Sequence, residues 1–118
     1  MNTSIKVLET QADFETLWFG RSTTRRWIVY FTASWCKACK KLDLEAIAAA
    51  AAEKDIEIFK CDETVNDYTA GYCGIRSFPT FVLFEPQATK SSLQSSQTEK
   101  VLEWIQGQGQ GQEQEQEQ

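Results

Sequence analysis

The sequence predicts an α/β fold, in which helices are layered on a central β-sheet, and three observations support it. Short runs rich in β-branched and aromatic residues alternate along the chain with segments of helical periodicity, as is typical of α/β proteins. Residues 27–32 (WIVYFT) are all β-branched or aromatic, which indicates a strand buried on both faces. The last two strand-like runs lie close together, so we expect them to form a hairpin.

The N-terminal part predicts a strand followed by a helix. Residues 5–8 are a short apolar-rich run. Thr10 and Asp13 then match a weak acidic variant of the capping box, and apolar residues recur at helical spacing from Phe14 onward. The central strand at residues 27–32 comes next.

The middle of the chain predicts a long helix, a second strand and a short helix. Residues 36–54 are rich in strong helix formers with apolar side chains spaced i, i+3, i+4 and i+7, so we expect one continuous helix that begins at or beside Cys36. Residues 56–61 (IEIFKC) predict a strand, and residues 66–73 predict a short helix or turn.

The C-terminal part predicts a hairpin and a final helix. Residues 80–84 (TFVLF) form an apolar strand just after Pro79. Residues 90–95 are a poor strand by composition, so we expect them at the edge of the sheet. Ser96 and Glu99 match a capping box, which would open the last helix.

Length and composition indicate one domain and a tail. The chain has 118 residues, of which 42% are hydrophobic and 25% charged, which fits a single globular domain at residues 1–106. Residues 107–118 (GQGQGQEQEQEQ) are a dipeptide repeat without an apolar residue, so we expect a disordered low-complexity tail.

Charge and hydropathy exclude some function classes. The net charge is −5, and three glutamates of the tail account for most of it, so the nearly balanced domain gives no reason to expect a nucleic-acid partner. No apolar run has the length of a bilayer span or of a secretory signal. We therefore expect a cytoplasmic protein without membrane contact, with an organelle left open if a transit peptide has been removed.

Cys36 and Cys39 form a Cys-x-x-Cys pair, which fits a metal site, a structural disulfide or a redox centre. A structural zinc site takes four Cys or His ligands, and without histidine Cys61 and Cys73 would have to converge on the pair. A structural disulfide that closes so small a loop removes little entropy from the unfolded chain. The redox interpretation uses more of the local sequence, because a helix start at Cys36 would favour its thiolate.

Two motifs resemble the thioredoxin family. They are Trp-Cys-x-x-Cys-Lys at residues 35–40, after the buried strand, and Phe-Pro-Thr-Phe at residues 78–81. The resemblance covers roughly residues 4–106. It implies a thioredoxin fold, with a central mixed sheet flanked by helices on both faces, and a thiol–disulfide oxidoreductase that reduces protein disulfides.

The resemblance also implies roles for individual residues. Cys36 resembles the attacking nucleophile and Cys39 the resolving cysteine of the family. Trp35 resembles the aromatic residue that flanks the site. Pro79, preceded by Phe78, resembles the family's cis-proline, which helps to dock the substrate backbone.

The chain departs from the family at several positions. Lys37 and Ala38 replace the usual glycine and proline between the cysteines, so the reduction potential cannot be inferred from the resemblance. Tyr30 occupies the place of a buried acid, which makes it a possible proton-transfer position or simply a core residue. Arg76 and Lys37 would give the rim of the site a positive charge that favours acidic partners; the alternative is that the lysines near the cysteines only form a solvated face.

Cys61 and Cys73 lie outside the Cys-x-x-Cys pair. Cys61 is expected to be a buried small hydrophobe, and Cys73 is either another such residue or a regulatory or dimer-forming thiol. We expect disulfide-containing protein substrates, an external reductant such as a thioredoxin reductase or the glutathione system, no cofactor or metal, and a monomer. The alternative function is a non-catalytic adaptor that binds a protein partner through the Pro79 surface.

Overall fold

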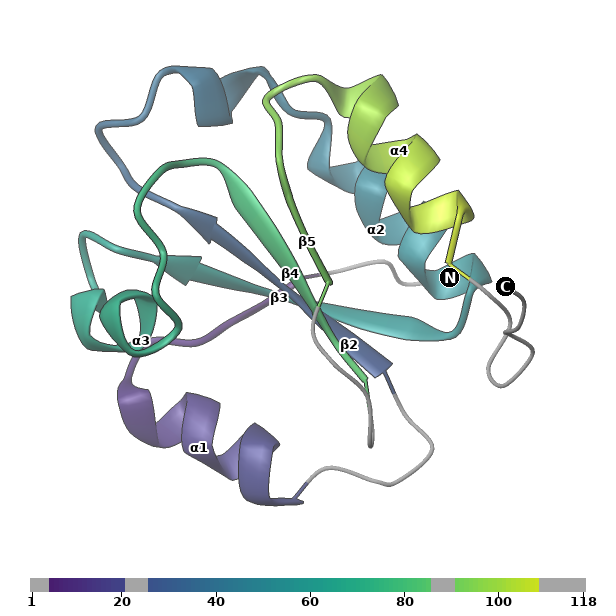
Figure 1. Cartoon of the computed structure of the whole chain (residues 1–118). Coiled ribbons are helices and arrows are strands. Elements are labelled where there is room, and N and C mark those ends of the chain that lie inside the picture. Colours follow the sequence, from purple (N-terminus) through teal and green to yellow (C-terminus); the bar gives the residue numbers. More distant parts are fainter. Residues whose placement is uncertain (1–4, 21–25, 86–90, 109–118) are drawn as a thin grey trace.

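The computed structural model describes residues 5–20, 26–85 and 91–108. Within these ranges five strands form one mixed sheet in the order β1-β3-β2-β4-β5 (Figure 1). β2 and β3 are parallel, as are β1 and β3, whereas β4 is antiparallel to β2 and to the edge strand β5. Their bounds are β1 (Lys6–Val7), β2 (Arg26–Thr32), β3 (Ile56–Asp62), β4 (Thr80–Phe84) and β5 (Ser91–Gln94). The predicted α/β fold and C-terminal hairpin are confirmed.

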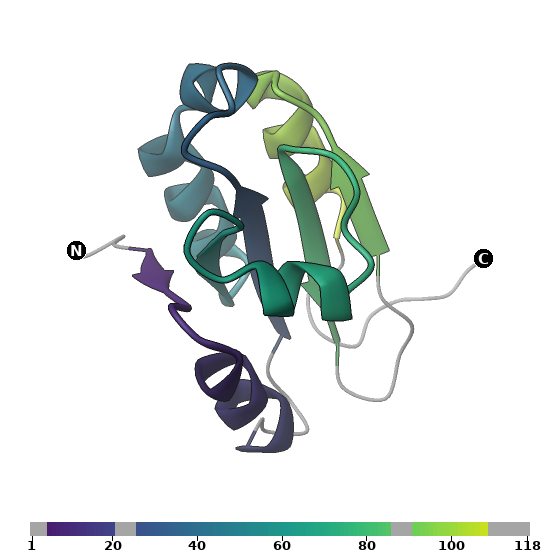
Figure 2. The ribbon, with the colours of Figure 1, turned by 90° about the vertical axis from the view of Figure 1, so that its left-hand side faces the viewer.

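Helices cover both faces of the sheet, as expected. They are α1 (Gln11–Gly20), the 3₁₀ helix η1 (Ala38–Lys41), α2 (Leu44–Glu53), α3 (Asp67–Tyr72) and α4 (Thr98–Gln106). α2 and α4 lie side by side on one face, and α1 and α3 lie on the other (Figure 1). Figure 2 shows the same two layers after a quarter turn. In the described part of the chain, no helix has the length and apolar character needed to cross a membrane.

β2 is the centre of the hydrophobic core. Its side chains alternate between the two helical layers, because successive residues of a strand point to opposite faces. Ile28 and Tyr30 pack with α2 and α4, whereas Trp27, Val29 and Phe31 pack with α1 and α3. All seven residues of the strand are buried, which confirms the prediction of a strand covered on both faces.

Two helix boundaries follow from local structure, one from side-chain hydrogen bonds and the other from a backbone angle. α1 begins with the predicted capping box, in which the Asp13 amide donates to Thr10 Oγ1 and the Thr10 amide donates to Asp13 Oδ2, both at 3.2 Å. α3 ends before Gly74, whose φ of 74° is a conformation that other residues rarely adopt. This turn leads the chain toward the loop before β4.

The predicted capping box at the start of α4 is wrong. The N-cap residue is Gln97, which makes no side-chain cap hydrogen bond, so the helix begins beyond Ser96. Thr98 is drawn into a tertiary contact instead, because its Oγ1 accepts a hydrogen bond from the Asp43 amide at 3.0 Å. Both Figure 1 and Figure 2 show η1 beside the start of α4.

The predicted continuous helix over residues 36–54 is also wrong. η1 and α2 are separate, and Leu42 between them is buried and extended with a ψ of 140°. Asp43 then caps α2, because its Oδ1 accepts a hydrogen bond from the Ala46 amide at 3.2 Å. Burial of Leu42 and the Asp43–Thr98 contact therefore override the helical propensity of the segment.

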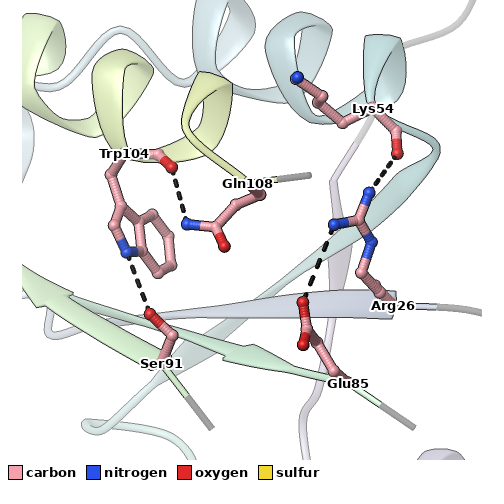
Figure 3. A network of polar contacts seen from close by, with 6 residues as sticks. All are labelled: Arg26, Lys54, Glu85, Ser91, Trp104 and Gln108. Carbon is pink, nitrogen blue, oxygen red and sulfur yellow. Dashed lines mark hydrogen bonds and ion pairs between the residues drawn. The ribbon is translucent and has the colours of Figure 1, made fainter. Parts of the chain in front are cut away.

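A buried arginine joins three elements at the end of β2 that lies away from the cysteines. Arg26 is only 8% exposed; its Nη2 donates to the Lys54 carbonyl at 2.9 Å, and its Nη1 lies 3.8 Å from Glu85 Oε2 (Figure 3). On α4, Trp104 Nε1 donates to Ser91 Oγ at 3.3 Å. These bonds connect the end of α2, the end of β4 and the start of β5 to the rest of the domain.

Candidate active site

The cysteine pair lies in the loop that leaves the carboxyl end of β2. Ala33 is buried, and the Cys36 amide donates to its carbonyl at 3.0 Å, which closes a tight turn. The amide and hydroxyl of Ser34 both donate to Thr64 Oγ1, at 3.0 and 2.9 Å. Because Thr64 follows β3, the loop is held between the carboxyl ends of two neighbouring strands.

The structure brings the two predicted redox cysteines together. Cys36 and Cys39 are joined by a disulfide, with their Cα atoms 5.4 Å apart. The exposed fractions are 5% for Cys36 and 4% for Cys39, so exposure of the oxidised pair does not distinguish attacker from resolver. The Cys39 amide donates to Cys36 Sγ at 3.1 Å.

The expected dipole of a long helix is not available to Cys36. The element that follows the residue is a 3₁₀ helix of four residues, and the chain leaves it before α2 begins. What remains is the single Cys39 amide, whose hydrogen bond to sulfur favours the thiolate form of Cys36 after reduction. Lys37, Lys40 and Lys41 are exposed, so solvent screens their charges.

Aromatic residues border the disulfide. Phe78 and Ala38 pack against the buried cluster of Ala33, Cys36 and Cys39. Trp35 is 63% exposed, and its ring meets the Phe78 ring edge-on with centroids 5.6 Å apart. The Phe78–Pro79 peptide bond is cis, as the family resemblance implies. Of the predicted site residues, Trp35, Ala38 and Phe78 are thus brought to the cysteine pair.

Tyr30 lies directly behind Cys39. Its hydroxyl donates to the Cys39 carbonyl at 3.4 Å, and its ring stacks on Phe81 with centroids 4.9 Å apart. Burial, and to a smaller extent the charge of Asp62, raise the pKa of the Tyr30 hydroxyl above its ordinary value. The residue therefore fills the core and contacts the site, but its neutral hydroxyl is a poor proton acceptor.

Sequence reasoning missed a pocket beside Cys39. The pocket has a volume of about 430 Å³ and is lined by Cys39 and Tyr30 together with three charged residues, Lys40, Lys60 and Asp62. Asp62 is the last residue of β3, where it pairs with the end of β2. Parallel strands end at the same edge of a sheet. The acid that directly follows the predicted strand at residues 56–61 was therefore the available sequence signal.

Arg76 and Cys73 line another pocket, of about 420 Å³, on the β4–β5 side. The proposed positive rim formed with Lys37 and the regulatory role of Cys73 therefore stay predictions. Cys61 is fully buried, which confirms the expectation of a small core residue. No group of three or more metal-binding side chains occurs among residues 5–20, 26–85 and 91–108.

Comparison with known proteins identifies the family. The thioredoxin family profile matches residues 6–107. The chain belongs to the thioredoxin family. The thioredoxin of Geodia cydonium is 30% identical over 81 residues, which cover 69% of this chain and 76% of that protein. The X-ray structure of Fasciola hepatica thioredoxin is 27% identical, with a TM-score of 0.73 and coverage of 86% of this chain and 97% of the other.

Members of the family with larger chains also match. Human protein disulfide-isomerase A6 is 41% identical over 64 residues, which are 50% of this chain and 14% of the isomerase. The chain therefore spans about a seventh of the length of that relative. Membership of the thioredoxin family confirms the predicted fold, and together with the Cys36–Cys39 disulfide it supports thiol–disulfide oxidoreductase activity in general.

Proposed function

We propose that this thioredoxin-family protein reduces disulfides of other proteins by dithiol–disulfide exchange. The observation that carries the proposal is the disulfide between Cys36 and Cys39, held at the end of the central strand beside the exposed ring of Trp35. A pair that closes in this position can open and close without rearrangement of the sheet. Such a pair suits exchange better than structural support, because the loop it closes is very short.

In the proposed cycle Cys36 is the attacking sulfur. Its thiolate is favoured by the hydrogen bond from the Cys39 amide. Attack on a substrate disulfide forms a mixed disulfide and releases one substrate thiolate. Cys39 then attacks Cys36, which releases the second thiolate and restores the intramolecular disulfide. An external dithiol or glutathione-type reductant supplies two electrons to start the next cycle.

An insulin-disulfide reduction assay with dithiothreitol tests the proposal. We expect the protein to accelerate the reaction well beyond dithiothreitol alone and Cys36→Ser to abolish the acceleration. Cys73→Ser is the matched control, because Cys73 is a half-buried thiol outside the disulfide cluster, and this variant should retain activity. A rate no better than dithiothreitol alone would support the adaptor, which would hold a partner without turnover through the surface around Pro79, where the Trp35 ring is exposed and the Phe78 ring is half-buried.

A further inference from the structure

We propose that Asp62 accepts, through water, the proton that Cys39 must lose before it resolves the mixed disulfide. This inference rests on the exchange activity proposed above and adds a residue to it. A thiol attacks a disulfide only as its thiolate. The resolving step therefore needs a proton acceptor near Cys39, and the neutral Tyr30 hydroxyl, with its raised pKa, is poorly suited to the task.

The sheet register places Asp62 on the correct face. In the parallel pair of β2 and β3, Tyr30 is the partner of Lys60 and Thr32 is the partner of Asp62. Neighbouring residues in register share a face, and Tyr30 identifies that face because its hydroxyl reaches the Cys39 carbonyl. The carboxylate thus lies on the Cys39 side of the sheet.

The pocket connects the two groups. Cys39 and Asp62 line the same open cavity of about 430 Å³, which is far larger than the ~30 Å³ that one water molecule occupies. Its lining offers polar partners for water, and its mouth is open to solvent, so a proton taken up by the carboxylate can leave to bulk water. Asp62 is itself half-buried, which keeps it inside the pocket rather than on the outer surface.

The charged groups around the pocket are few and come from two elements. Lys40 on η1 is exposed, and its Nζ donates to the Ser34 carbonyl at 3.1 Å, so it is engaged at the rim. Lys60 on β3 is half-buried and lines the same wall as Asp62. Asp62 is therefore the carboxylate among the residues that line the pocket with Cys39.

The step balances as follows. The Cys39 S–H bond breaks, and its proton passes through water to the Asp62 carboxylate. The Cys39 thiolate attacks Cys36 Sγ, the bond between Cys36 and the substrate sulfur breaks, and the electron pair leaves with the substrate as a thiolate. The two cysteines are oxidised by two electrons, and the substrate disulfide is reduced to two thiols.

Stopped-flow reaction with dithiobis(nitrobenzoate) separates the two steps. The prereduced protein carries Cys73→Ser, so that the half-buried third thiol does not contribute. Attack by Cys36 releases the first coloured thiolate, and resolution by Cys39 releases the second. We expect Asp62→Asn to leave the first phase unchanged and to slow the second about tenfold or more near neutral pH, as removal of a proton acceptor does.

Two further variants distinguish proton transfer from structural damage. Asp62→Glu should recover part of the second rate, whereas Glu63→Gln, which removes a neighbouring carboxylate outside the pocket lining, should behave as the parent. Asparagine retains an oxygen for the hydrogen bond that Asp62 Oδ1 accepts from the Thr64 amide at 2.9 Å. The difference between Asp62→Asn and the parent should shrink as the pH rises, because Cys39 then ionises unaided.

The outcomes are separable. A second phase of Asp62→Asn equal to the parent, an equal loss in Glu63→Gln, or a loss that is independent of pH would overturn the role of Asp62. Absence of a Cys36-dependent first phase would instead overturn the exchange function itself. Far-UV circular dichroism of each variant verifies that the fold is retained.

Discussion

Replacement of Arg26 by methionine should destabilise the fold measurably. Methionine keeps much of the apolar stem in place but removes both polar contacts. The Arg26 Nη2 bond to the Lys54 carbonyl, at 2.9 Å on a side chain only 8% exposed, is a hydrogen bond from a charged donor, worth about 1.5–3 kcal/mol. The contact with Glu85 is long, at 3.8 Å, and Glu85 is 31% exposed, so it adds at most about 1 kcal/mol.

The expected loss is therefore about 2 kcal/mol of unfolding free energy. For a domain of about 100 residues this lowers Tm by roughly 8–10 °C. Urea titrations followed by far-UV circular dichroism, with the disulfide intact in every sample, measure the free energy directly. The m-value should not change, because the surface exposed on unfolding stays the same.

Glu85→Gln is the matched control, since it removes the long ion pair and leaves the bond to Lys54. We expect it to lose less than about 1 kcal/mol, and its loss should diminish as salt concentration rises. The reasoning fails if Glu85→Gln destabilises the protein as much as Arg26→Met. It also fails if Arg26→Met is as stable as the parent.

Two further predictions concern the groups behind the site. Tyr30→Phe should lower the free energy of unfolding by at most about 1 kcal/mol, because the hydroxyl's bond to the Cys39 carbonyl is long at 3.4 Å and the Leu42 amide also donates to that carbonyl at 3.3 Å. The rate of insulin reduction should be unchanged. A large fall in turnover would give the hydroxyl a chemical role. Burial raises the pKa of the Cys61 thiol to about 12, so at about pH 9 only about one thiol in a thousand is ionised. Iodoacetamide should therefore label Cys61 in urea but not in the native protein. Labelling of the native protein, detected by mass spectrometry, would contradict this prediction. The same shift lowers stability as pH rises from the ordinary thiol value toward 12, because the unfolded chain loses that proton first.

Much of the fold could be predicted because its signals are local. The order of strands and helices follows from runs of β-branched residues and from helical periodicity, and the start of α1 follows from the Thr10–Asp13 pair. The interruption between η1 and α2 could not be predicted in the same way. It depends on a hydrogen bond from Asp43 to Thr98, which lies 55 residues further along the chain.

The candidate site likewise has parts that local sequence patterns predict and parts that depend on long-range contacts. The cysteine motif and the Phe78–Pro79 motif were visible as short patterns, and the structure brings Phe78 to the disulfide. The pocket was not visible, because the residues that line it come from β2, η1 and β3 and meet only through the strand register. The place of Asp62 directly after residues 56–61 was a sequence signal, but it did not tie the residue to Cys39, which lies far from it in the sequence.

The separation of η1 from α2 decides how the loop that carries Cys36 and Cys39 is connected to the rest of the domain. On one side the loop is anchored to β2, whose backbone is bonded to strands on both edges, and on the other side it ends at the extended residue Leu42. The cysteines thus lie on a short segment of their own, which is joined to α2 through extended backbone and not through continuous helix. A change in the backbone at the cysteines is therefore not passed to α2 along a shared helix axis.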